Sequence, residues 1–148
     1  MKLKVLSVAS EAVPLVKTGG LADVAGALPA ALAGQGIEVT TLVPGYPPVM
    51  KALGKARAVH AWDGLLGEPA RLLAGKLGAQ PLLVLDAPAY FARDGGPYTD
   101  AAGKDWADNW RRFAALARAA ADLAGGVVKG CSFDLVHAHD WQAAMVPA

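Results

Sequence analysis

Short apolar segments alternate with longer segments of helical spacing along this chain. The short segments are rich in Val and Leu, are flanked by Gly, Pro or Asp, and cover residues 3–9, 37–43, 82–85 and 135–138. Continuous apolar runs of this length are typical of strands that are buried on both faces of a parallel sheet. The pattern therefore predicts four buried strands.

Two segments between these strands have the spacing of helices. The first covers 21–32 and is ended by Gly34 and Gly36, and the second covers 105–124 with Asp105 as its predicted N-cap. In the second, apolar side chains recur every three or four residues and polar side chains fall on the other faces. The predicted apolar positions are Trp106, Trp110, Phe113, Ala117, Ala121 and Ala124, and the predicted polar ones are Arg111, Arg112, Arg118 and Asp122. Because Arg118 and Asp122 stand four residues apart, we expect them to pair.

The region 54–78 is less regular, and its segments 58–62 and 71–77 are candidate strands of a hairpin or a sheet edge. Strands that alternate with helices predict an α/β fold with an open, doubly wound, mainly parallel sheet of the Rossmann-like type. Ligands of such sheets bind outside the carboxyl ends of the strands. The candidate site segments are therefore those that follow the first strand, Leu85 and Ala138.

Composition limits the classes of partner. The chain has 148 residues, enough for one domain, and a net charge of +1 with no basic block. Neither nucleic acid nor an anionic membrane is therefore the expected main partner, and a small molecule or another part of the same protein is favoured. Cys131 is the single cysteine, which excludes an internal disulfide and a cysteine metal cluster.

The two ends of the sequence carry expectations of their own. The basic start at Lys2 and Lys4 imitates a secretory signal, but the apolar stretch is short and Glu11 interrupts it. No apolar run reaches the ~20 residues of a spanning helix. A single cysteine is the usage expected in a reducing cytoplasm, so we expect a cytoplasmic protein. Residues 139–145 resemble the start of a helix that continues past Ala148, so we expect the chain to be an incomplete part of a larger protein.

The segment after the first strand ends in Lys17, Thr18, Gly19 and Gly20, which we call the Lys17–Gly20 loop. Glycines allow backbone N–H groups to approach an anion, and the positive end of the following helix dipole favours phosphate. Lys17 adds a full positive charge. The spacing matches neither GxxxxGK[ST] nor GxGxxG, so a phosphate site and a plain glycine-rich turn both stay open. Asp23 lies in the first helical turn, where a carboxylate often serves only the dipole.

The other two segments offer further alternatives. Tyr98, in a long loop after the third predicted strand, is suited to contact a sugar ring or simply to anchor the loop. His137 and His139 share one face of a strand and, with Asp140, suggest a metal-dependent hydrolase. Equally, Asp140 and Trp141 are suited to contact a sugar, or the histidines belong to the core and Asp140 is a helix N-cap.

The order of several motifs resembles bacterial glycogen synthases and plant starch synthases. The resemblance spans the chain, and Ala22 is closer to the bacterial form. One residue, Trp110, departs from it, because a smaller residue is more usual there. The motifs are Lys17-Thr18-Gly19-Gly20-Leu21-Ala22-Asp23-Val24, Leu42-Val43-Pro44-Gly45-Tyr46-Pro47, Asp86-Ala87-Pro88, Gly96-Pro97-Tyr98, Asp108-Asn109 and His137-Ala138-His139-Asp140-Trp141-Gln142.

The resemblance implies a GT-B glycosyltransferase, in which two Rossmann-like domains face each other across a cleft. It further implies retaining transfer of glucose from ADP-glucose to the non-reducing end of an α-1,4-glucan, without a metal or other cofactor. Residues 1–148 would be an incomplete N-terminal, acceptor-side domain, inactive alone because its C-terminal nucleotide-binding domain is absent. A non-catalytic carbohydrate-binding module is a further alternative.

The resemblance also implies roles for individual residues. Lys17, Gly19 and Gly20 would contact the donor phosphates or the transferred glucose. The acceptor side would be lined by Asp23, Tyr98, Asp140 and Trp141. No residue of these 148 is an assured catalytic group on this basis, because the leaving group would be neutralised from the other domain.

Overall fold

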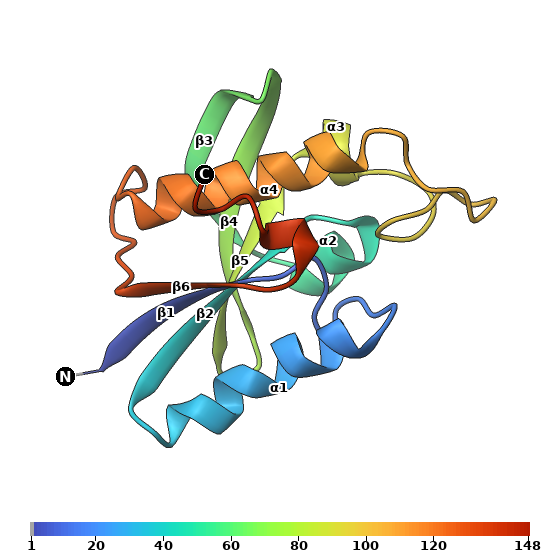
Figure 1. Cartoon of the computed structure of the whole chain (residues 1–148). Coiled ribbons are helices and arrows are strands. Elements are labelled where there is room, and N and C mark those ends of the chain that lie inside the picture. Colours follow the sequence, from blue (N-terminus) through green and yellow to red (C-terminus); the bar gives the residue numbers. More distant parts are fainter. Residues whose placement is uncertain (1) are drawn as a thin grey trace.

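A mixed six-stranded sheet with helices on both faces forms the body of the computed structural model, which describes residues 2–148 (Figure 1). The strand order is β3-β4-β5-β2-β1-β6. Four strands are parallel, namely β1 (Leu3–Val8), β2 (Ile37–Pro44), β5 (Gln80–Asp86) and β6 (Leu135–Ala138). The predicted doubly wound, mainly parallel α/β sheet is confirmed.

The region 54–78 forms the antiparallel hairpin that the sequence suggested. Its strands are β3 (Arg57–Leu65) and β4 (Glu68–Leu77), and β4 pairs antiparallel with β5. The hairpin therefore extends one edge of the sheet.

The two long helices lie on opposite faces of the sheet, as Figure 1 shows. They are α1 (Gly20–Ala33) and α4 (Asn109–Ala124). Two short helices, α2 (Pro47–Leu53) and α3 (Pro88–Phe91), were not predicted, and each begins at a proline, a residue suited to the first turn of a helix. A helix was expected to start after residue 139. The described chain forms only the short 3₁₀ helix η1 (Trp141–Ala143) there.

The core fills the space between the sheet and these helices. The carboxyl halves of β1 and β2 and most of β5 are buried, as the apolar runs predicted. The prediction that β6 is buried on both faces was wrong: Leu135 is 52% exposed. In the part of the chain that the structure describes, β6 pairs with β1 and forms the sheet edge.

Helix α4 differs from its prediction in two ways. It begins at Asn109, four residues later than expected, because Asp105 instead forms an isolated β-bridge with Thr99. Its apolar face is also shifted: Trp110, expected to be buried, is 68% exposed, whereas Arg112, expected on a polar face, is fully buried. The predicted pair of Arg118 and Asp122 is confirmed, with Nε and Oδ1 2.9 Å apart.

The topology places a switch point at one end of the sheet. From β1 the chain crosses through α1 to β2 on one side, whereas β6, on the other side of β1, is reached through α4. A sheet of this kind has its switch point between β1 and β6, and ligands bind there outside the carboxyl ends. The segments that follow Val8 and Ala138, which pair with each other, therefore meet at this point.

Candidate functional site at the carboxyl ends of the parallel strands

A buried carboxylate, Glu11, stands at the centre of the site. Its side chain is 1% exposed. Its Oε2 accepts hydrogen bonds from the N–H of Thr18 (3.1 Å) and the hydroxyl of Thr18 (2.5 Å), and its Oε1 accepts one from the N–H of Gly19 (3.2 Å). The hydroxyl of Tyr98 donates to Oε2 at 3.3 Å. Glu11 therefore joins the Lys17–Gly20 loop to the loop that carries Tyr98.

Lys17 lies on the outer side of this loop. Its Nζ donates to Oδ2 of Asp23 at 2.6 Å, and the two side chains are 53% and 55% exposed. An exposed ion pair of this kind contributes about 0–1 kcal/mol. The pair holds Lys17 near the start of α1. Because the pair is weak, Lys17 can exchange Asp23 for another anion at little cost in free energy.

Open space lies over the two glycines of the loop. A Cβ atom built on Gly19 or Gly20 would meet no heavy atom within 4 Å. Gly19 has extended backbone that any residue adopts, with φ −154°. The fold itself therefore does not require glycine at these positions. The N–H of Gly19, expected to face a ligand, is instead bound by Glu11.

Tyr98 is fixed from its backbone and from its hydroxyl. The side chain of Asn109 and the N–H of Trp106 both donate to the Tyr98 carbonyl, at 2.9 and 3.1 Å. The hydroxyls of Ser10 and Tyr98 are 2.7 Å apart. Burial, followed by the nearby Glu11 carboxylate, raises the pKa of Tyr98 to about 12. The phenol is therefore a neutral donor at physiological pH.

The buried guanidinium of Arg112 supports the same loop. Its Nε donates to the carbonyl of Tyr90 at 2.6 Å, and its Nη1 donates to the carbonyl of Pro97 at 2.8 Å and to Oδ1 of Asn109 at 2.7 Å. Desolvation lowers the pKa of Arg112. A shift of an arginine pKa leaves the group charged at neutral pH. This charge therefore holds the chain just before Tyr98.

Trp141 brings the segment after β6 to the same place. Its ring centroid is 6.2 Å from that of Tyr98 and 5.2 Å from that of Phe113. Trp141 is 54% exposed, so part of its ring is open to a ligand. Asp140, with φ 61°, accepts a hydrogen bond on Oδ1 from the Trp141 N–H at 2.7 Å. The alternative of Asp140 as an N-cap is thus realised, on a 3₁₀ helix, and its side chain remains exposed.

An apolar hollow of about 170 Å³ continues from Trp141 along the start of α4. The amide oxygen Oε1 of Gln142 is buried and has no hydrogen-bond partner within residues 2–148. The hollow is lined by Trp110, Phe113, Trp141, Gln142 and Met145.

The two histidines share one face, as predicted. The rings of His137 and His139 stack with centroids 4.0 Å apart, and Nε2 of His139 lies 3.0 Å from the Ser7 hydroxyl. Burial and then the neighbouring His137 lower the pKa of His139. Within residues 2–148 no three His, Cys, Asp or Glu side chains are grouped to hold a metal ion. His137, His139 and Asp140 therefore do not form the three-ligand set of the hydrolase alternative.

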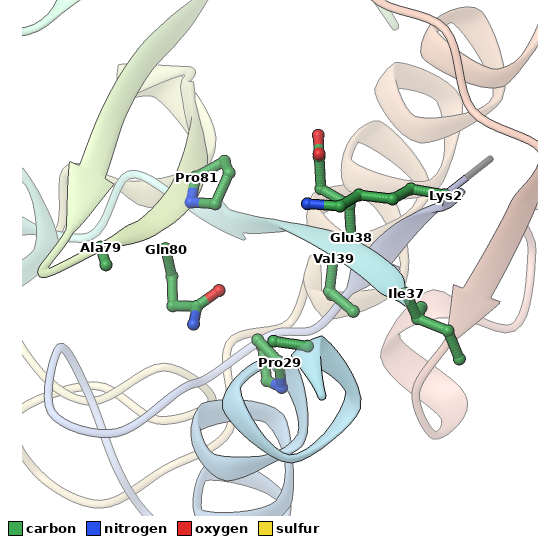
Figure 2. Close-up of a pocket in the computed structure, with 9 residues that line it drawn as sticks. Lys2, Pro29, Ile37, Glu38, Val39, Ala79, Gln80 and Pro81 are labelled. Carbon is green, nitrogen blue, oxygen red and sulfur yellow. The ribbon is translucent and has the colours of Figure 1, made fainter. Parts of the chain in front are cut away.

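A separate hollow of about 250 Å³ lies at the opposite end of the sheet (Figure 2). Ile37 and Pro81, which line it, stand at the amino ends of β2 and β5. Figure 2 shows the side chains of Lys2 and Glu38 next to each other among the residues that line it. It is therefore remote from the carboxyl ends of the strands, where the predicted site residues gather.

Residues 4–148 match the family described as starch synthase catalytic domain. The chain belongs to this family. It is 72% identical over 148 residues to a glycogen synthase of Novosphingobium aromaticivorans and 57% identical over 146 residues to glycogen synthase 1 of Rhizobium meliloti. These matches cover 100% and 98% of the chain and 30% of each relative. The resemblance stated from the motifs is confirmed.

A solved structure supports the same conclusion. The catalytic domain of starch synthase IV from Arabidopsis thaliana, bound to ADP and acarbose, superposes with a TM-score of 0.74 at 29% identity. The match covers 99% of this chain and 29% of the other. The chain thus has the Rossmann-like fold found in this starch synthase catalytic domain. It spans about a third of the length of these relatives.

No helix of residues 2–148 is long and apolar enough to cross a membrane. This accords with the absence of a long apolar run in the sequence.

Two functional candidates were missed from the sequence. The sequence patterns give Glu11 only as a break in the apolar start and Arg112 only as one polar residue of a helix. One feature of the sequence could have indicated Glu11: it is a lone carboxylate in a largely apolar stretch directly after a buried strand. A charge at such a position requires buried hydrogen-bond partners.

Proposed function

We propose that this chain is the N-terminal, acceptor-side part of a glycogen synthase that transfers glucose from ADP-glucose to an α-1,4-glucan with retention of configuration. The related glycogen synthases support the activity, and the starch synthase bound to ADP supports an adenine nucleotide donor. Because the chain spans about 30% of its relatives, a second domain would supply the rest of the cleft.

One observation carries the proposal. The Lys17–Gly20 loop, Tyr98 and Trp141 come from distant parts of the sequence and meet at the switch point of the sheet, linked through Glu11 and by aromatic contacts. A crevice at that point is the place where α/β sheets of this type bind ligands.

The donor would lie against the Lys17–Gly20 loop. A departing nucleoside diphosphate develops negative charge, and fixed donors aimed at that charge lower the barrier. Lys17 can exchange its exposed partner Asp23 for a diphosphate, and the free space over Gly20 lets a phosphate approach the backbone at the start of α1. Lys17, Gly19 and Gly20 are therefore the proposed donor contacts, with Gly19 supplying space rather than its N–H. No metal or other cofactor is required in this proposal.

The acceptor glucan would lie on the other wall. The exposed part of the Trp141 ring offers an apolar platform for a sugar face, while the Tyr98 hydroxyl and the carboxylates of Asp23 and Asp140 offer polar contacts to hydroxyl groups. We therefore propose Asp23, Tyr98, Asp140 and Trp141 as acceptor residues.

The decisive experiment measures glucose transfer by a full-length enzyme that carries this domain. Lys17→Ala should lower kcat about a hundredfold, because one lost charge at a developing oxyanion typically costs a few kcal/mol. Lys76→Ala removes an exposed lysine at the opposite end of the sheet and should leave kcat unchanged. Unchanged kinetics in Lys17→Ala would contradict the donor role.

The two alternative functions predict different results in two further experiments. Loss of activity with a chelator and its recovery with zinc would favour a metal-dependent reaction. Calorimetry of the 148-residue chain with maltooligosaccharide and with ADP-glucose tests the carbohydrate-binding module. Half a cleft should bind either ligand weakly, so tight glucan binding by the chain alone would favour the module.

A further inference from the structure

We propose that Glu11 is a positioning residue of the transfer reaction, whose carboxylate fixes the Lys17–Gly20 loop against Tyr98. This role rests on the proposed function, because it assumes that the loop contacts the donor. In this role Glu11 contacts neither substrate. It holds the proposed donor-binding loop in a fixed position relative to Tyr98, a proposed acceptor residue.

The carboxylate is built into the fold as an acceptor of several hydrogen bonds. Two of them come from backbone N–H groups of the loop, at Thr18 and Gly19, and two come from the hydroxyls of Thr18 and Tyr98. The sequence separation between Glu11 and Tyr98 is 87 residues, so the last bond joins two independent loops. Ser10, the preceding residue, adds a second contact to the Tyr98 hydroxyl at 2.7 Å.

Neutral donors alone satisfy this carboxylate. Within residues 2–148, no Lys, Arg or His nitrogen lies within 4.0 Å of it, since the ion pairs found involve other carboxylates. A buried charge held by N–H and O–H groups requires each of those groups to stay in place. The loop backbone is therefore fixed by Glu11, and not by the weak, exposed pair of Lys17 and Asp23.

The same bonds decide which parts of the loop remain for a ligand. Because the N–H groups of Thr18 and Gly19 are directed at Glu11, the remaining groups are the Lys17 side chain and the backbone at Gly20. Loss of the Glu11 carboxylate would free the two amides and let the Lys17–Gly20 loop move relative to Tyr98. A displacement of about 1 Å at a reacting centre can cost a hundredfold in rate.

Glu11→Gln tests the role with little change of volume. The amide keeps one oxygen but replaces the other by an NH₂ group, which cannot accept from Thr18 or Tyr98. We expect E11Q to lower kcat of the full-length enzyme about tenfold or more. Glu38→Gln, the same change at an exposed position near the amino end of β2, should leave kcat unchanged (Figure 2).

A double-mutant cycle separates positioning from plain stability. If Glu11 acts through Lys17, E11Q should cost tenfold in the presence of Lys17 and less than about threefold in the Lys17→Ala background. A purely structural role predicts the same loss in both backgrounds, because the fraction of folded enzyme does not depend on Lys17. Thermal unfolding curves of all four proteins give the fraction that is folded at the assay temperature.

The outcomes are distinct. Wild-type kcat in E11Q, or equal losses in both backgrounds, would overturn the role of Glu11 while leaving the proposed function intact. Absence of glucose transfer by the unsubstituted enzyme would overturn the proposed function and this role together. If E11Q fails to fold, Thr18→Ala and Thr18→Ser replace it: only serine keeps the hydroxyl that donates to Glu11, so equal kcat in the two would also overturn the role.

Discussion

At the scale of single residues, Gly20 shows how a requirement of function can be separated from a requirement of the fold. Gly20 is the first residue of α1, and a Cβ atom there would meet nothing within 4 Å. Glycine inside a helix is about 0.5–1 kcal/mol less favourable than alanine, so the fold gains nothing from it. A ligand that approaches the backbone closely would explain its presence.

We predict that Gly20→Ala leaves the free energy of unfolding unchanged or raises it by up to about 1 kcal/mol, yet lowers kcat about tenfold or more in the full-length enzyme. Urea denaturation and the transfer assay measure the two effects. Gly34→Ala, at a position that is equally open but lies at the far end of α1, should not change kcat. Equal activity of the two variants would remove Gly20 from the donor site.

At the scale of elements, the contrast between Trp110 and Arg112 shows where sequence patterns fail. Periodicity located α4 but assigned its faces by polarity, so it placed the arginine outside and the tryptophan inside. The structure reverses both: Trp110 is exposed, and Arg112 is buried because its guanidinium finds carbonyl acceptors at Tyr90 and Pro97. Those acceptors lie 22 and 15 residues away, in α3 and in the loop after it, whose path no local pattern reveals. The strands were easier to predict from the sequence, because a buried strand appears as a continuous run of apolar residues.

Helix α1 carries a second test at this scale. A Cβ atom at Gly26 would lie 2.5 Å from the carbonyl oxygen of Val13, because the loop after β1 packs directly on the helix there. Gly26→Ala should therefore lower the free energy of unfolding by roughly 1–3 kcal/mol, although helix propensity alone favours alanine. Gly34→Ala, with φ −66° and no neighbour within 4 Å, should raise it by about 0.4–1 kcal/mol.

Urea denaturation of the two variants compares the signs directly. An increase of stability in Gly26→Ala would mean that the loop after β1 can move away from α1 at no cost. The close approach would then not fix the position of that loop, which leads into the Lys17–Gly20 loop.

At the scale of the whole molecule, the sequence predicted where the site lies. It did not predict the hydrogen bonds that hold the site together. Alternating strands and helices predicted a crevice at the carboxyl ends, and the motif residues Lys17, Tyr98 and Trp141 do meet there. Glu11 links the Lys17–Gly20 loop to Tyr98, and this link exists only because the fold brings the loops after β1 and β5 together. Long-range hydrogen bonds of this kind leave no period in the sequence, so only the three-dimensional structure reveals them.

His139, which follows β6, makes the free energy of unfolding of the whole chain depend on pH. Burial and the stacked His137 hold the pKa of His139 below its ordinary value of 6.5. Between the lowered value and 6.5 the unfolded chain binds more protons than the folded chain, so acidification favours unfolding. The free energy of unfolding should fall as the pH drops below 6.5, by at most about 1.4 kcal/mol per pH unit for this group. Urea denaturation between about pH 5 and pH 7 measures the slope.

His139→Gln supplies the control, because glutamine cannot titrate but can still form a hydrogen bond with the Ser7 hydroxyl. Its slope below pH 6.5 should be smaller than that of the unsubstituted chain. Since β6 pairs only with β1 within residues 2–148, protonation of His139 acts on the edge strand that carries Asp140 and Trp141. Identical slopes would show that the folded chain accommodates the charged imidazole at this edge, and that the acid sensitivity of the domain arises elsewhere.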